Sequence, residues 1–163
     1  MLAVSNTSPI SNLASIGRLD LLKSQFPVLW IPTAVAQELK AHPDPAALAA
    51  IEAAIDGQWM RIAAPQDSHL HRVLLLQLHK GEAETIALAT DLKADSVIID
   101  EQEGRGLAAQ AGLSVTGTLG VLLRAKSSGT IKAVRPEIQA LRAKARFFLS
   151  SPLEAEVLRA AGE

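Results

Sequence analysis

Short, almost wholly apolar segments alternate with longer helical patterns along this chain, and the alternation constrains the fold more than any other feature. The segment Ser96-Val97-Ile98-Ile99 is typical, because it is nearly all apolar and is followed at once by Asp100. Strands of this kind are buried on both faces, as in parallel sheets covered by helices. Strands that alternate with helices predict right-handed crossovers and an α/β fold, a three-layer α/β/α sandwich with a mainly parallel central sheet.

The same pattern predicts where the elements lie. The expected strands are Leu2–Ser5, Val28–Ile31, Trp59–Ile62, Ser96–Asp100 and Leu113–Thr116. The expected helices are Pro9–Gly17, Leu19–Ser24, Thr33–Ala41 with Thr33 as its N-cap, Asp44–Ile55, Ser68–His79, Glu82–Lys93, Glu101–Ala111, Leu119–Lys126, Pro136–Arg146 and Pro152–Ala161. We expect a single domain over residues 1–163, with residues 133–163 as a C-terminal helical extension packed on it.

Composition narrows the possible partners. The chain is 48% hydrophobic but only 3% aromatic, so its core is expected to be aliphatic. It contains no Cys, which excludes disulfides and thiolate metal sites and fits a reducing, cytoplasmic setting. No apolar run reaches the ~18–20 residues of a membrane span, so no membrane partner is expected. The net charge of −1 provides no global positive field, so a polyanion would need local basic groups or a bound cation.

Acidic residues follow several of the predicted strands. In sheets of this kind, ligands bind beyond the carboxyl ends of the strands, where Asn6 and Asp100 are expected. The acidic residues expected near this edge are Glu38, Glu82, Glu84, Asp100, Glu101 and Glu103. Carboxylates gathered there would repel one another unless a cation neutralised them, and such oxygen ligands suit Mg²⁺ or Mn²⁺. A cation so placed can activate water and stabilise phosphate oxygens during an in-line displacement.

Each of these acids also has a purely structural interpretation. Glu82 and Glu84 lie in a first helical turn, where negative charge favours the helix dipole. They are two positions apart, about 200° around the helix, so only one is expected to face the cluster, and the periodicity does not say which. Glu38 alone is typical of a solvated helix residue, and Glu101 and Glu103 of residues that are solvated or cap the next helix.

Five segments in order resemble a known family. Residues 4–10, 31–39, 81–89, 98–101 and 112–123 read VSNTSPI, IPTAVAQEL, GEAETIALA, IIDE and GLSVTGTLGVLL. Together they resemble PIN-domain proteins, in particular the prokaryotic branch with a GEAE-type helix and a GTLG segment. The resemblance implies a ribonuclease dependent on Mg²⁺ or Mn²⁺, in many relatives the toxin of a type II toxin–antitoxin pair. RNA and a cognate antitoxin would then be the partners.

The resemblance also assigns roles to residues. Glu38, Glu84 (or Glu82) and Asp100 would be acidic metal ligands, Glu101 would be auxiliary, and Ser8 would orient a ligand or water. Asn6 departs from the family pattern, because PIN domains typically have Asp there as the central metal ligand.

Asn6 changes the expected chemistry. An amide carbonyl can coordinate Mg²⁺, but only as a neutral ligand, and metal affinity depends on ligand charge. We expect one weak metal site, or none at ordinary Mg²⁺ levels, with activity that depends on high Mn²⁺. Two alternatives stay open: a catalytically impaired PIN-like binding or scaffold module, and a receiver-like or nucleotide-binding α/β domain, although the phosphoacceptor Asp and late-strand Lys of a receiver are not found.

The C-terminal part suggests further contacts. Its basic residues are Arg124, Lys126, Lys132, Arg135, Arg142, Lys144 and Arg146. They form either a solvated face or a track for an RNA backbone. Tyr is absent and Phe is scarce, so base stacking is not expected to drive recognition. Apolar stripes on the Ala- and Leu-rich C-terminal helices suit a homodimer or an antitoxin segment.

Overall fold

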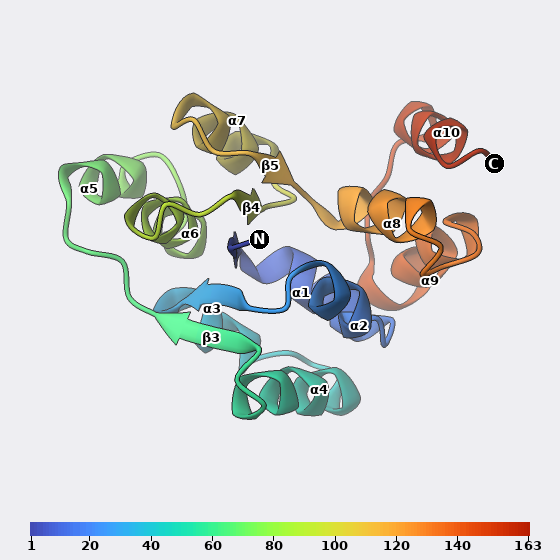
Figure 1. Ribbon diagram of the computed structural model, residues 1–163, viewed down its shortest axis with the longest axis horizontal. Helices are drawn as coiled ribbons and strands as arrows, with labels where there is room; N and C mark the ends of the chain where they lie inside the picture. Colours follow the sequence, from blue (N-terminus) through green and yellow to red (C-terminus); the bar gives the residue numbers. More distant parts are fainter.

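A five-stranded, all-parallel sheet forms the centre of the protein (Figure 1). The computed structural model describes all residues, 1–163. The strands are β1 (Ala3–Ser5), β2 (Leu29–Pro32), β3 (Met60–Ala63), β4 (Ser96–Ile98) and β5 (Val115–Thr116), in the order β3-β2-β1-β4-β5. All five predicted strands are present, and the predicted α/β fold is confirmed.

Ten helices connect and cover the strands. They are α1 (Thr7–Ser15), α2 (Leu19–Gln25), α3 (Thr33–Leu39), α4 (Pro45–Asp56), α5 (His69–Leu75), α6 (Lys80–Asp91), α7 (Gln102–Gln110), α8 (Thr118–Ser127), α9 (Arg135–Ala145) and α10 (Ser151–Ala160).

Several helix boundaries differ from the expected ones, and two of the differences have a structural cause. Helix α5 ends at Leu75 rather than His79, because the chain turns over residues 76–78 and buries Leu78 against the core. Thr33 is the first residue of α3 rather than its N-cap. The N–H of Ala34 donates instead to Oε2 of Glu84 at 3.0 Å, so a side chain from α6 satisfies this helix end.

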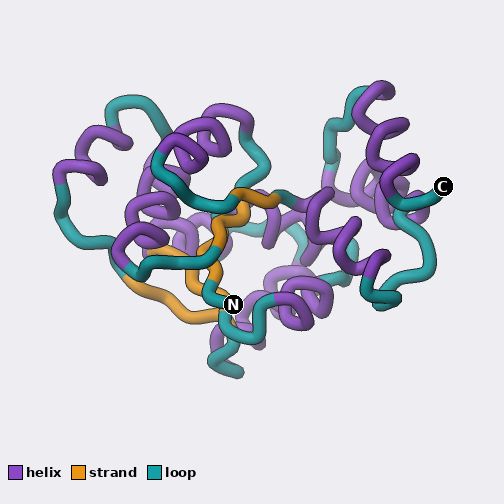
Figure 2. Tube along the Cα trace, turned by 45° about the horizontal axis from the view of Figure 1, so that its top comes forward, coloured by secondary structure: helices purple, strands orange, loops and turns teal.

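The two faces of the sheet build two separate cores. Ala3 and Ile98 point into the larger core, which also contains side chains from α1, α2, α4, α8, α9 and α10. Val4 and Val97 point to the opposite face and pack with α5, α6 and α7. Successive strand residues therefore alternate between faces. This arrangement gives the three layers that the sequence predicts, with the strands between two sets of helices (Figure 2).

Helices α8, α9 and α10 gather at one end of the molecule (Figure 1). Ile138 and Leu141 of α9 and Val157 and Leu158 of α10 belong to the larger core. Residues 133–163 thus share the packing of the residues before them. None of the ten helices combines the length and apolar composition that crossing a bilayer requires.

The sheet topology determines where a ligand could bind. The strand order runs outward in both directions from the β1–β4 pair, so the chain reverses its direction of winding there. In open parallel sheets, ligands bind beyond the carboxyl ends of the strands at this reversal point. Asn6 follows β1, and Asp100 lies two residues after the end of β4.

Candidate active site

Asn6 lies at the centre of this edge. Its N–H donates to the carbonyl of Ile98 at 3.0 Å, so the backbone of β1 remains paired with β4 to its last residue. Asn6 is the N-cap of α1, yet its side chain makes no capping hydrogen bond and is buried. Instead Nδ2 donates to Oε2 of Glu101 at 3.0 Å. The amide therefore faces the acids rather than its own helix.

Glu38 lies on α3, and its carboxylate approaches Gly81, as the amide of Asn6 does. Its Oε2 accepts a hydrogen bond from the Thr7 hydroxyl at 2.5 Å. Its Oε1 faces Gly81 at the start of α6, where a β-carbon would lie only 2.7 Å from Oε1 of Glu38 and 3.2 Å from Oδ1 of Asn6. Both oxygens thus pack closely against Gly81, and a glycine at this position permits their approach.

Asp100 is held on the other side of the edge. Its Oδ1 accepts from the N–H of Thr118 at 2.7 Å, and its Oδ2 accepts from the Thr118 hydroxyl at 2.6 Å and from Nδ2 of Asn12 at 3.1 Å. Burial raises the pKa of Asp100 above its usual range, the Thr118 and Asn12 hydrogen bonds oppose this rise, and the charge of Glu101 adds to it. The carboxylate is therefore both rigidly placed and costly to ionise.

Glu101 connects the end of β4, where Asp100 lies, to Asn6 and Ser8. One of its oxygens accepts from Asn6, and the other accepts a short hydrogen bond from the Ser8 hydroxyl. It is the N-cap residue of α7 but makes no capping hydrogen bond with its side chain. Ser8 and Glu101, predicted from the family resemblance, are thus in direct contact.

Glu82 and Glu84 diverge, as their spacing around α6 predicts. Glu84 is buried at the N-terminus of α3, where it accepts from Ala34 and lies 3.8 Å from Nζ of Lys80. Glu82 is also buried, with its Oε1 against Gly104 of α7. Burial and then the charge of Glu101 raise the pKa of Glu82. The structure therefore places Glu82 near Glu101 and α7, and Glu84 against the N-terminus of α3, the helix that carries Glu38.

The oxygen ligands fit a small divalent cation by type. Asn6, Glu38, Glu82, Asp100 and Glu101 offer carboxylate or amide oxygens, the ligands that Mg²⁺ and Mn²⁺ prefer. Oδ1 of Asn6 and Oε1 of Glu38 both lie close to Gly81. No three His, Cys, Asp or Glu side chains converge as a metal site, because Glu38, Asp100 and Glu101 each turn to neutral donors. Coordination therefore requires these side chains to turn toward a common point.

Sequence reasoning missed the neutral donors that hold the acids. Thr7, Asn12 and Thr118 were not predicted as site residues, although each donates to a carboxylate there. One signal was available for Asn12, because Ser8 and Asn12 are four positions apart and share a face of α1. Thr118 begins α8 within the GTLG segment, where it follows β5 at the same edge of the sheet.

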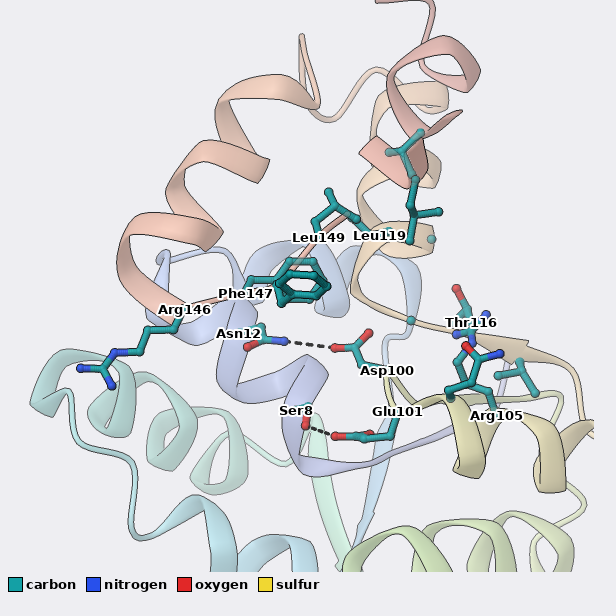
Figure 3. Close-up of a pocket in the computed structure, with 18 residues that line it drawn as sticks. Ser8, Asn12, Asp100, Glu101, Arg105, Thr116, Leu119, Arg146, Phe147 and Leu149 are labelled. Atoms are coloured by element: carbon teal, nitrogen blue, oxygen red, sulfur yellow. Dashed lines mark hydrogen bonds between the residues drawn. The ribbon is translucent and has the colours of Figure 1, made fainter. Parts of the chain in front are cut away.

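A cavity of about 750 Å³ opens beside Asp100 and Glu101 (Figure 3). Ser8 and Asn12 line the same wall, and Arg105 lies close to Asp100, with its Nη1 donating to the carbonyl of Ile99 at 2.9 Å. A ligand as large as a nucleotide would reach the acidic edge through this cavity.

Comparison with known families agrees with this geometry. A family model for a PIN domain, DUF3368, matches residues 2–163. The chain belongs to the PIN-domain family. The PIN domain is typically a nuclease fold, and PIN domains generally use divalent metals.

A solved structure is also similar to this PIN domain. It is a PilT N-terminus domain protein from the hyperthermophilic archaeon Sulfolobus solfataricus, 19% identical, with a TM-score of 0.47 over 77% of this chain and 93% of that chain. No curated protein matches the sequence. Within this PIN domain, the amide of Asn6 stands at the end of β1 and donates to an acid.

Proposed function

We propose that the protein is a metal-dependent endoribonuclease of PIN type. Asn6, Glu38, Glu82 and Asp100 would hold one Mg²⁺ or Mn²⁺ ion, with Glu101 beside it. The observation that carries this proposal is the close approach of Oδ1 of Asn6 and Oε1 of Glu38 to Gly81, at the reversal point of the sheet. Membership of a typically nucleolytic, metal-using family supports it.

The residues around the acids have distinct tasks in this proposal. A bound divalent ion would supply an activated water and charge neutralisation for the phosphate. Thr7 holds Glu38, and Thr118 with Asn12 holds Asp100, in the metal-free protein, and these acids would turn from those donors toward the ion when it binds. Ser8 orients Glu101. Glu84 accepts a hydrogen bond from the N–H of Ala34 at the start of α3. Its proposed role is therefore to hold α3, and with it Glu38, in position.

The amide of Asn6 limits this chemistry. It contributes a neutral oxygen where the family typically has a carboxylate, so the site has one negative charge fewer. The expected result is weak binding of a single ion, with activity that requires Mn²⁺ at high concentration.

A catalytically impaired binding module is the second candidate. The hydrogen bond from Nδ2 of Asn6 to Glu101 favours it, because the amide relieves acidic repulsion without any cation. In that case the protein would bind RNA but not cut it.

The proposed biological role is that of a toxin neutralised by a cognate antitoxin, and the protein would act as a homodimer in the cytoplasm. The GEAE and GTLG segments support this role through their resemblance to such toxins. Induced expression should arrest growth, and Asp100→Asn should relieve the arrest. Growth unaffected by the intact chain would argue against the toxin role.

Cleavage of single-stranded RNA in the presence of Mn²⁺ tests the proposed activity. The intact chain should cut the RNA, EDTA should stop the reaction, and Asp100→Asn should lower the rate at least ~100-fold. Asp95→Asn is the matched control, because Asp95 lies at the other end of β4, where it accepts from the N–H of Leu2 at 2.6 Å. RNA binding without cleavage would select the binding module instead.

A further inference from the structure

The cavity beside the acidic edge has a second wall of a different character (Figure 3). Its apolar side is formed by Leu119 of α8, by Phe147, Phe148 and Leu149 of the segment between α9 and α10, and by Leu153 of α10. Figure 3 shows the ring of Phe147 on the side of the cavity that faces Asn12 and Asp100. One cavity thus joins acidic oxygens to an aromatic surface.

The placement of the aromatic residues is unusual for this chain. The protein has only three Phe and no Tyr, and two of the Phe are adjacent in this cavity. The Phe148 side chain is 89% exposed. Burial normally stabilises a large apolar ring, and this ring remains in contact with water at the mouth of a cavity. Its exposure there indicates a ligand surface.

The segment that carries these rings is held in place. Arg146 ends α9 in the left-handed conformation, with φ of 51° and ψ of 35°, and this turns the chain across the cavity. The N–H of Phe147 donates to the carbonyl of Leu141 at 3.2 Å, and Arg142 donates to the carbonyl of Leu149 at 3.2 Å. An ion pair between Arg142 and Glu154 ties the segment to α10. The rings are therefore presented on a supported backbone.

Cationic groups flank the rings. Arg105 and Arg146 both line the cavity, and neither forms an ion pair with a carboxylate. Apart from its bond to the Ile99 carbonyl, Arg105 has further N–H groups available for a phosphate. Aromatic faces flanked by arginines are the combination that single-stranded nucleic acids bind, through base stacking and backbone charge.

We propose that this cavity is a nucleotide subsite: a base of single-stranded RNA stacks on Phe147 and Phe148, with its phosphate between Arg105 and the acidic edge. The proposal rests on the proposed ribonuclease function and names how that site would hold its substrate. It departs from the expectation that base stacking does not drive recognition, because two of the three Phe lie together in this cavity. Stacking accepts any base, so the subsite would position RNA more than select a sequence.

The test uses a short single-stranded RNA containing 2-aminopurine, whose fluorescence falls on stacking, with Ca²⁺ in place of Mn²⁺. The variants are Phe148→Leu and Phe147→Leu with Phe148→Leu, which keep apolar bulk but remove the rings. Leu76→Ala is the matched control, because Leu76 is 85% exposed and lies between α5 and α6, outside this cavity. Circular dichroism checks that each variant folds. The single variant Phe148→Leu changes only one side chain, which is exposed.

We expect the intact chain to quench the fluorescence, and the double variant to bind RNA at least ~5-fold more weakly with the quenching lost. In Mn²⁺ the same variants should raise KM more than they lower kcat.

Variants that match the intact chain in quenching and KM, while Asp100→Asn still abolishes cleavage, would overturn the subsite alone. No RNA binding and no cleavage by the intact chain would overturn the ribonuclease proposal too. Loss of a dimer in the Phe variants, with RNA affinity unchanged, would assign the rings to a second copy of this chain.

Discussion

Asn6 is the residue whose chemistry most affects this site. Its Oδ1 lies against Gly81, as does Oε1 of Glu38, while its Nδ2 donates to Glu101. The amide thus performs two tasks that a carboxylate could not combine, because it offers one neutral oxygen and one hydrogen-bond donor. It reduces repulsion among the acids and also reduces the charge available to a cation.

Asn6→Asp should therefore tighten Mn²⁺ binding by at least ~10-fold, about 1.4 kcal/mol, because the added charge attracts the ion. In EDTA the same variant should unfold at a lower temperature, since the new carboxylate would face Glu101 without a donor between them. Isothermal titration with Mn²⁺ measures the first effect and thermal unfolding the second. Gln139→Glu adds the same charge at an exposed position of α9 as a control. Equal Mn²⁺ affinities for the intact chain and Asn6→Asp would contradict this account of the amide.

Glu82 gives the site a pH dependence. Its pKa is raised, first by burial and then by the charge of Glu101, so its ionised form is less favourable in the folded protein than in the unfolded one. The cost of this ionisation is absent below the ordinary pKa of glutamate. It appears as pH rises and is complete above the raised pKa.

Glu82→Gln should accordingly raise the Tm of the metal-free protein near pH 7 and leave it nearly unchanged near pH 4. Each kcal/mol of relieved cost corresponds to roughly 2–4 °C for a protein of this size. With Mn²⁺ present, the intact chain should have the higher Tm, because binding of the ion stabilises it more than it stabilises Glu82→Gln. Glu52→Gln, on the exposed face of α4, controls for loss of one surface charge. A Tm difference that is the same at both pH values would count against a buried, costly Glu82.

Helix α6 connects the two halves of the site through its first turns. Gly81 leaves room for Glu38 and Asn6, Glu82 faces α7, and Glu84 closes the N-terminus of α3. One short stretch of helix therefore sets the positions of Asn6, at the end of β1, and of Glu38, on α3. Its buried polar residues are placed by these contacts rather than by helix propensity.

Gly81→Ala should separate function from stability at this helix. In a helix, Gly→Ala is normally stabilising by up to ~1 kcal/mol. At position 81 the new β-carbon would press on Oε1 of Glu38, a flexible side-chain end that can move, so the fold should survive while Mn²⁺ binding weakens. Gly106→Ala in α7 is the matched control, since a β-carbon there meets no atom within 4 Å, and it should raise Tm with Mn²⁺ binding unchanged. Titration and thermal unfolding of both variants make the comparison. Unchanged Mn²⁺ affinity in Gly81→Ala would show that the positions of Asn6 and Glu38 beside Gly81 do not determine cation binding.

The elements themselves were largely predictable from sequence. Apolar strands bounded by polar residues and helices ended by glycine or proline gave all five strands and ten helices, with boundaries displaced by a few residues. The N-terminus of α3 could not be predicted, because its partner, Glu84, is 50 positions away in sequence. The choice between Glu82 and Glu84 depends on the positions of α3 and α7 around α6, which periodicity alone does not encode.

At the level of the whole molecule, the sheet order explains why distant residues meet. Residues 6, 38, 82 and 100 come from four elements, and the parallel order β3-β2-β1-β4-β5 brings them toward one edge. The α/β rule that ligands bind beyond the carboxyl ends of the strands points to this edge, and the structure places Asn6 and Asp100 there. It did not predict the cavity, because its far wall is built by residues 145–157, whose position depends on how α9 and α10 pack back on α8 and α1.

The most direct test is an anomalous diffraction map from a crystal of the intact chain grown with Mn²⁺. We expect one peak at coordination distance, about 2 Å, from Oδ1 of Asn6 and a Glu38 oxygen, with Asp100 or Glu82 turned toward it and Glu84 still hydrogen-bonded to the N–H of Ala34. A map with no peak at the carboxyl edge of β1 and β4, or a peak coordinated by Glu84 instead, would contradict this set of metal ligands.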